Sequence, residues 1–139
     1  LNTSWAADIE SRLWLKVAVN GAINPLTSIH HCLNGRLVES KILRRQVELL
    51  CAETAELFRV LNVKITKNDI INEVFSVIDK TANNYSSMLQ DTNSGKNTEI
   101  EAITGYLLEK AKLHNLELKT HQALYQAIVS PLINPITPS

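Results

Sequence analysis

Residues 14–27 read Trp-Leu-Lys-Val-Ala-Val-Asn-Gly-Ala-Ile-Asn-Pro-Leu-Thr, and the interpretation of the chain starts from them. Within this stretch Lys16, Asn20 and Asn24 recur at a spacing of four residues. On an α-helix this spacing places the three side chains in one row on one face. Most residues between them are apolar, so the row differs from an ordinary solvated face, which carries many charges. The pattern predicts one cation and two carboxamides that point into a partly buried site, where polar groups need partners.

The same row also has a structural interpretation, which the spacing alone slightly favours. In it Asn20 and Asn24 bridge neighbouring helices, and the stem of Lys16 lies along apolar surface with its ammonium in water. Pro25 follows the row directly and lacks a backbone N–H, while Gly21 weakens a helix. The sequence therefore predicts a kink or break in this helix near Asn24.

The remaining segments also have helical periodicity, and none alternates apolar and polar residues as a half-buried strand does. The sequence predicts an all-α fold of roughly six or seven helices joined by short polar loops. We expect a domain over residues 1–129 and an extended or disordered tail over residues 130–139. The expected local features are a helix from about Ala7, a turn at Asn34-Gly35, where Asn-Gly tolerates positive φ, a helix from about Lys41 to Leu61, a Thr66 cap with Asp69 in the first turn, a Thr98–Glu101 capping box, and a last helix capped by Thr120 with Ala123, Leu124, Ala127 and Ile128 facing inward.

Composition excludes several classes of function. The 139 residues are 45% hydrophobic and 20% charged, and 14 basic residues balance 14 acidic ones. This balance gives no global field to attract nucleic acid or an anionic membrane, and no apolar run could span a bilayer. The two cysteines, Cys32 and Cys51, lie in apolar contexts, which favours reduced thiols and a cytoplasmic protein. His30 and His31 beside Cys32 point to different sides of a helix, so we expect no metal site there.

The ends and the glycines of the chain predict that it is part of a longer protein. It begins at Leu1, and its single methionine is Met88. None of the four glycines is placed to form a phosphate-binding glycine-rich loop. Any nucleotide would therefore be held mainly by a part of the protein outside this sequence.

Four short motifs together resemble a known family, over about Ile9 to Ile128. In this order and spacing they resemble the C-terminal domain of ketopantoate reductase (2-dehydropantoate 2-reductase). The resemblance implies a helical domain of the 6-phosphogluconate dehydrogenase C-terminal type, preceded by a Rossmann domain that holds NADPH. It also implies reduction of 2-dehydropantoate to pantoate, in the biosynthesis of pantothenate and coenzyme A. The motifs are Trp14-x-Lys16-x-x-x-Asn20-x-x-x-Asn24-Pro25-Leu26-Thr27, Asn34-Gly35, Asn84-x-Ser86-Ser87-Met88-Leu89-Gln90-Asp91 and Thr98-Glu99-Ile100-Glu101-x-Ile103-x-Gly105.

The resemblance implies a role for each matching residue. Lys16 matches the catalytic lysine and proton donor, and Glu99 matches a glutamate between that lysine and the cofactor. Chemistry agrees for Lys16, because an ammonium can stabilise the negative charge that hydride transfer leaves on a ketone oxygen and then release a proton. The residues that match the family's substrate contacts are Asn20, Asn24, Asn34, Asn84, Ser86 and Ser87.

Other interpretations of these residues and of the whole chain stay open. Without the resemblance, Glu99 would be an ordinary first-turn acid, and Ser86 and Ser87 would cap a helix. The parent enzyme could reduce a different 2-keto acid, or the chain could be a helical dimerisation or interaction module without chemistry. As a domain detached from its Rossmann partner, the chain should be catalytically inert and should expose apolar surface that favours a homodimer.

Overall fold

The computed structural model describes the backbone of residues 2–93 and 99–130 and the side chains of residues 9–91 and 99–130. All regular elements in these ranges are helices, which confirms the all-α prediction. They are α1 (Asn2–His30), α2 (Arg36–Glu39), α3 (Lys41–Val60), α4 (Lys67–Lys80), α5 (Ser87–Asn93), the π-helix η1 (Glu101–Gly105), α6 (Tyr106–Leu113) and α7 (Lys119–Val129).

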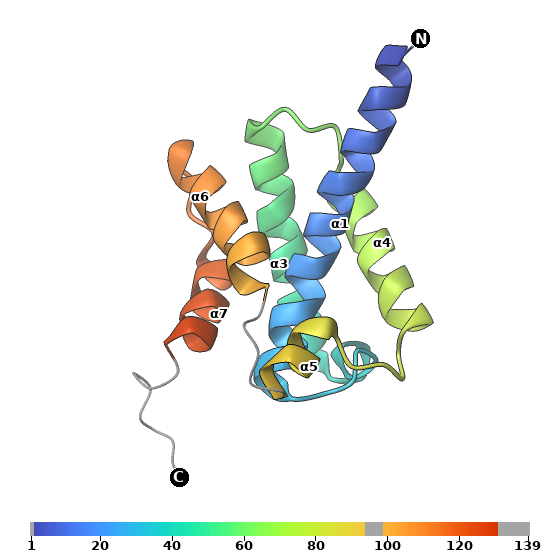
Figure 1. Ribbon diagram of the computed structural model, residues 1–139, viewed down its shortest axis with the longest axis vertical. Coiled ribbons are helices and arrows are strands. Elements are labelled where there is room, and N and C mark those ends of the chain that lie inside the picture. The colour runs from blue at the N-terminus through green and yellow to red at the C-terminus, as the bar shows by residue number, and fades with distance from the viewer. Residues whose placement is uncertain (1, 94–98, 131–139) are drawn as a thin grey trace.

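Helix α1 is the central element of the fold. It packs against α3, α4, α5, α7 and η1, and its N-terminal end extends beyond the other helices (Figure 1). The residues of α1 that face the core are small or aliphatic, so neighbouring helices approach closely. Trp14 contacts α3 and also α6, because its ring lies 5.3 Å from that of Phe58 in α3 and 6.2 Å from that of Tyr106 in α6. The buried core residues of α1 are Ala18, Val19, Ala22, Ile23 and Leu26.

The predicted break near Asn24 is wrong, because α1 continues without interruption and contains Pro25. A proline inside a helix removes one backbone hydrogen bond. Here the surrounding turn is buried, with Ile23 and Leu26 at most 2% exposed. The Thr27 hydroxyl also lies 3.1 Å from the carbonyl oxygen of Ile23 and 3.2 Å from that of Asn24. Packing around the proline therefore holds the helix together.

The predicted turn at Asn34-Gly35 is present, but it does not use the positive φ that Asn-Gly tolerates. Gly35 has φ −63°, and the left-handed residue is His31 with φ 49°. Gly35 is needed for a close approach instead. Its N–H donates to the carbonyl of Ala82 at 3.0 Å, and a β-carbon at this position would lie 2.9 Å from Cβ of Ala82.

The predicted cap of α4 is confirmed, and the bounds of α3 agree with the expected helix from Lys41 to Leu61. Thr66 Oγ1 accepts a hydrogen bond from the amide of Asp69 at 3.1 Å. The carboxylate of Asp69 in turn accepts from the amide of Thr66 at 2.9 Å. Both partners lie within three residues, so the sequence alone was sufficient to predict this capping box.

The predicted cap of α7 is wrong, because Leu118 holds the cap position and its side chain makes no capping bond. The cap comes from Glu53 in α3, whose carboxylate accepts from the amides of Thr120 at 2.6 Å and His121 at 3.0 Å. The predicted inward face is also only partly correct. Ala123 is exposed, whereas His121 is almost wholly buried.

The predicted capping box at Thr98–Glu101 lies partly outside the described residues, because Thr98 is not among them. The carbonyl of Glu99 accepts from the amide of Ile103 at 3.0 Å, so helical hydrogen bonding begins at Glu99. The carboxylate of Glu101 binds the hydroxyl of Tyr125 in α7 at 2.7 Å. Of the predicted tail only Ser130 is described. None of the described helices is long and apolar enough to cross a lipid bilayer.

Candidate active site

The row of Lys16, Asn20 and Asn24 lies on α1 as predicted, and burial increases along it. The Lys16 side chain is exposed, Asn20 is half-buried and Asn24 is only 8% exposed. The row therefore runs from solvent at Lys16 into the domain at Asn24. A small ligand that entered from the Lys16 end would find a cation first and carboxamides behind it.

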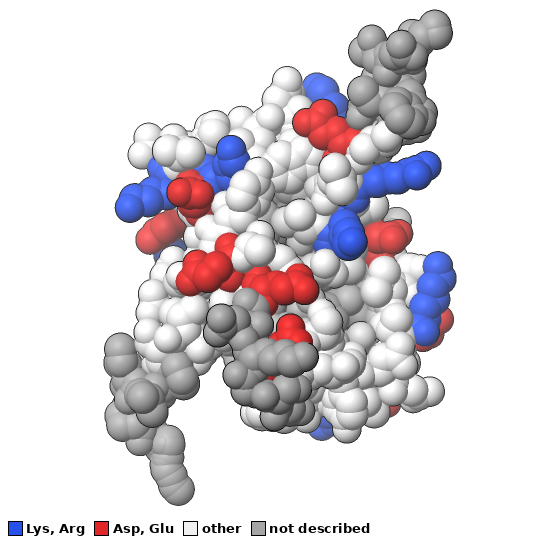
Figure 2. Space-filling view, viewed as in Figure 1, with Lys and Arg blue, Asp and Glu red and all other residues white. Residues whose placement is uncertain are grey.

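The exposed end of the row lines a small hollow between α1 and α4, with a volume of about 290 Å³. Arg12, Lys16 and Asn20 contribute from α1, and Glu73 contributes from α4. Two cations and one carboxylate thus surround one opening. In Figure 2 basic and acidic side chains lie close together on the right of the view, the side on which Figure 1 shows α4.

Arg12 and Glu73 were not among the predicted site residues. Arg12 precedes Lys16 by four residues, so extending the row by one turn toward the N-terminus would have included it. Glu73 has no comparable local signal, because only the packing of α4 against α1 brings it to the hollow.

Asn34 and Asn84 lie on two chain segments that are hydrogen-bonded to each other. The amide of Asn34 donates to the carbonyl of Asn84 at 3.0 Å. The Asn34 side chain is buried, and its Nδ2 donates to Thr81 Oγ1 at 2.9 Å. Its Oδ1 is also buried and has no hydrogen-bond partner within the described part of the chain. Such an unsatisfied buried acceptor is unusual in a folded protein.

Ser86 and Ser87 differ in their environments. Ser86 is buried, and its Oγ accepts from the amide of Leu89 at 3.1 Å and lies 2.7 Å from Oγ1 of Thr27. It therefore caps α5 and joins it to α1. Ser87 and Asn84 are exposed, so these two side chains are accessible to a ligand while Ser86 holds their segment in place. Substrate contact by any of the three stays a prediction.

Glu99 is exposed and lies two residues before the start of η1, which packs against α1. The contact is close at Gly21, the residue after Asn20. A β-carbon on Gly21 would lie 3.3 Å from Cδ1 of Leu107 and 3.6 Å from Cγ2 of Ile103. The fold thus brings η1 and the start of α6, which follow Glu99 in the chain, against the helix that carries Lys16. Direct proximity of the two charges stays a prediction, because no ion pair between them is found among the described residues.

A buried polar cluster that the sequence did not predict joins α3 to α7. His121 Nδ1 lies 2.7 Å from the Glu53 carboxylate, and its Nε2 lies 3.4 Å from Oγ1 of Thr54. Burial alone would raise the pKa of Glu53, but hydrogen bonds from His121 and Thr120 outweigh it, so the pKa lies below its usual value. His121 and Thr54 are almost wholly buried, so this cluster serves the fold and is closed to substrate.

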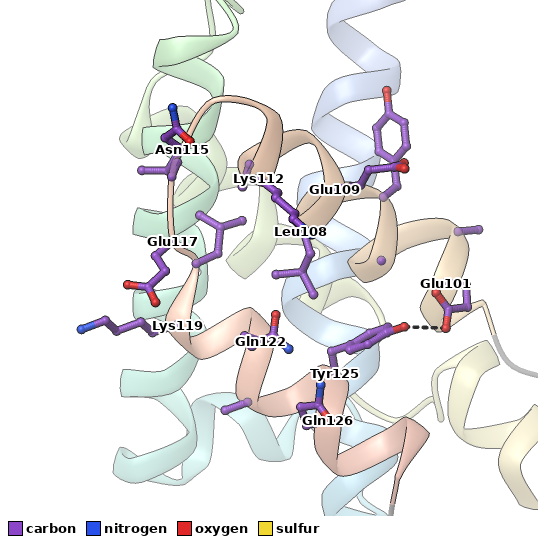
Figure 3. A pocket seen from close by; sticks show the side chains of 17 residues that line it. Glu101, Leu108, Glu109, Lys112, Asn115, Glu117, Lys119, Gln122, Tyr125 and Gln126 are labelled. Carbon is purple, nitrogen blue, oxygen red and sulfur yellow. Dashed lines mark hydrogen bonds between the residues drawn. The ribbon is translucent and has the colours of Figure 1, made fainter.

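A larger groove of about 1270 Å³ lies between η1, α6 and α7 (Figure 3). It contains none of the predicted site residues, so its size does not mark it as the site of chemistry. The bond from Tyr125 to Glu101 joins α7 to η1 at one side of it. This bond and the neighbouring charge of Glu101 raise the pKa of Tyr125 above its ordinary value.

Comparison with solved structures defines the class of protein. A probable 2-dehydropantoate 2-reductase from Bacillus subtilis matches with a TM-score of 0.72 and 33% identity, over 82% of this chain and 38% of that one. D-mandelate dehydrogenase in complex with NADH matches with a TM-score of 0.82, over 88% of this chain and 42% of that one. At 22% identity the second match shows the fold alone. The chain has the fold of a helical domain found in reductases and dehydrogenases.

The sequence defines the family. The chain belongs to the family described as ketopantoate reductase PanE/ApbA C terminal, whose model matches residues 8–130. A 2-dehydropantoate 2-reductase from Yersinia pestis is 39% identical over 127 residues, which cover 91% of this chain and 41% of the relative. The enzyme of that name from Archaeoglobus fulgidus is 34% identical over 121 residues, 87% of this chain and 40% of the relative. The chain thus spans about two-fifths of the length of these relatives.

Proposed function

We propose that this chain is the substrate domain of an NADPH-dependent reductase that converts 2-dehydropantoate to pantoate, in the biosynthesis of pantothenate and coenzyme A. The family and the named relatives support this assignment. The observation that carries it is the row on α1, in which an exposed ammonium leads to a buried carboxamide.

We also propose that NADPH is bound mainly by an N-terminal Rossmann domain outside this sequence. The cofactor, when bound, supplies a hydride to the keto carbon of the substrate. Within this chain the exposed carboxylate of Glu99, beside the helix that carries the row, fits a contact to a ribose hydroxyl.

The residues of this chain would bind the keto acid and supply a proton. The ammonium of Lys16 would stabilise negative charge on the substrate oxygen and donate the proton that completes the alcohol. Asn20, Asn24 and Asn34 would hydrogen-bond the polar groups of the substrate without repelling its carboxylate. The exposed side chains of Asn84 and Ser87 would donate to that carboxylate.

The test is the turnover of 2-dehydropantoate with NADPH by the full-length protein and by its Lys16→Ala variant. Loss of a general acid should lower kcat by at least about a hundredfold. Lys41→Ala removes an exposed ammonium from the first turn of α3, outside the candidate site, and serves as the matched control. Undiminished kcat in Lys16→Ala would remove this residue from the mechanism.

The identity of the keto acid requires its own measurement. Lys16 and the row fix the chemistry at the keto group more closely than they fix the acyl group. Comparison of kcat/KM for 2-dehydropantoate with that for other 2-keto acids separates the proposed enzyme from a relative with another substrate. A helical interaction module, by contrast, would keep its function after replacement of Asn20 and Asn24 by alanine.

We further propose a cytoplasmic protein that self-associates through apolar surface. Both cysteines are free, as expected in a reducing compartment. Ile42, Leu113 and Leu13 are 74%, 71% and 60% exposed, so apolar side chains are available for association. Sedimentation of the full-length protein over a range of concentrations tests this proposal, and a monomer at every concentration would contradict it.

A further inference from the structure

The π-helix η1 is the only π-helical turn in the described part of the chain, and it directly follows Glu99 and Ile100. The amide of Ile103, inside η1, donates to the carbonyl of Glu99 at 3.0 Å, an i to i+4 bond that joins Glu99 to the turn. The backbone of Glu99 is thus bonded to this turn through its carbonyl. A π-helical turn has poorer hydrogen-bond geometry than an α-helical one, and it persists where the surrounding structure holds it.

On one side η1 is held by α1. Ile103 is buried, and it lies against Gly21, where a β-carbon would come 3.6 Å from its Cγ2. This contact sets how closely η1 approaches the helix that carries Lys16 and Asn20. It does not by itself prevent the turn from rotating about the buried Ile103 side chain.

On the other side η1 is held by α7. Tyr125 donates its hydroxyl proton to Oε2 of Glu101 at 2.7 Å (Figure 3). The other oxygen of Glu101 lies back over the turn, because a β-carbon on Gly105 would come 2.7 Å from Oε1. The absence of a side chain at Gly105 thus lets the carboxylate face Tyr125.

Helix α7 gives this second attachment a firm base. Its first turn is bound to α3 by the carboxylate of Glu53, through the amides of Thr120 and His121 and the ring of His121. Tyr125 lies one turn after His121 on the same helix. The hydroxyl that binds Glu101 therefore belongs to an element fixed to the core of the domain.

We propose that Tyr125 is a positioning residue for Glu99, acting through Glu101 and the π-helical turn. This inference rests on the proposed function, in which Glu99 acts beside Lys16. Two attachments, at Gly21 and at Tyr125, fix both the distance of the turn from α1 and its rotation. Without the second one, Glu99 would sample orientations away from the Lys16 row.

The first test is a double-mutant cycle in the full-length protein. Tyr125→Phe should lower kcat for 2-dehydropantoate about fivefold, the effect of losing one hydrogen bond, and leave KM for the keto acid unchanged. In a Glu99→Gln background the same substitution should change kcat less than about twofold, because its target is already altered. Tyr106→Phe removes a phenol hydroxyl from the neighbouring helix and is the matched control. An equal effect of Tyr125→Phe in both backgrounds, or no effect in either, would overturn the proposal.

The second test does not depend on the substrate. Hydrogen exchange of the Ile103 amide, which binds the Glu99 carbonyl, should be about fivefold faster in full-length Tyr125→Phe than in Tyr106→Phe. Equal exchange rates would overturn the positioning role. If the wild-type protein does not reduce 2-dehydropantoate, the proposed function fails, and exchange at Ile103 still decides whether Tyr125 holds the turn.

Discussion

At the scale of single residues, Glu53 of α3 has a structural role that no local sequence pattern predicted. Its carboxylate accepts two backbone amides and the ring of His121, all from the start of α7. A buried N-terminus of a helix needs such acceptors, and no side chain within α7 supplies them. One residue of α3 thus replaces the local cap that Thr120 was predicted to provide.

Replacement of Glu53 by glutamine should lower the free energy of unfolding by about 1–3 kcal/mol. An uncharged amide accepts hydrogen bonds less strongly, and its NH₂ group would face the donors of α7. Urea denaturation followed by circular dichroism measures this loss. Glu56→Gln, one turn further along α3 on an exposed side chain, is the matched control. Equal stability of the two variants would contradict the assigned role.

The same variant has a defined pH dependence. The pKa of Glu53 is lowered in the folded state from an ordinary value of 4.5. Its ionised form therefore contributes stability above that value, and the contribution is lost as the pH falls through the lower folded pKa. The stability difference between wild type and Glu53→Gln should be full at pH 7 and should shrink below about pH 4.5.

At the scale of elements, the pairing of residues 34–35 with residues 82–84 connects two predicted substrate-binding segments. The amides of Asn34 and Gly35 donate to the carbonyls of Asn84 and Ala82, each at 3.0 Å. The two backbones approach so closely that Gly35 has no room for a side chain. The positions of the Asn34 and Asn84 side chains therefore depend on a residue that has no side chain of its own.

Gly35→Ala should destabilise the protein by about 1–3 kcal/mol, because the new methyl group would overlap Ala82 and separate the two segments. Thermal denaturation of the variant measures the loss. Addition of Ala82→Gly removes the nearest side-chain atom, so the double variant should recover part of the stability. No loss in the single variant would show that the segments move apart freely.

The helices whose caps are local could be predicted from the sequence, and those whose caps are distant could not. Thr66 and Asp69 bind each other within three residues, and the pattern identified them. The partner of His121 lies 68 positions away in the chain, and no local pattern connects the two. The prediction at Pro25 failed for a related reason, because burial by neighbouring helices offsets a hydrogen bond that an isolated helix would miss.

In the candidate site, too, the features set by local sequence could be predicted and those set by distant residues could not. The spacing of four residues predicted the row on α1, which depends on one helix. The hollow at its end also needs Glu73 from α4, and the turn that follows Glu99 packs against Gly21 of α1 and is bonded to Tyr125 of α7. Those contacts arise from packing between elements, which periodicity does not encode.

At the scale of the whole molecule, the core encloses one thiol that reports on its integrity. Cys51 is 1% exposed, and burial raises its pKa to about 12. Cys32 is only half-buried, and burial raises its pKa more modestly. A thiol reagent at pH 8 should therefore label Cys32 in the native protein and reach Cys51 only after global unfolding.

The measurement is the labelling rate of each cysteine as a function of urea concentration, with Cys32→Ser as the variant that isolates Cys51. The urea midpoint for Cys51 should coincide with that from circular dichroism. Labelling of Cys51 well below that midpoint would show that α3 opens locally.

Because α1 continues through Pro25, Lys16 and Asn24 belong to one helix, and the helical rise sets the distance between them along its axis. From Lys16 to Asn24 the backbone of this continuous helix rises about 12 Å. A ligand that contacts both Lys16 and Asn24 must therefore be long enough to span this distance together with the two side chains. Discrimination between short and long acids would then come from the separation of Lys16 and Asn24, which only the flexible lysine side chain can adjust.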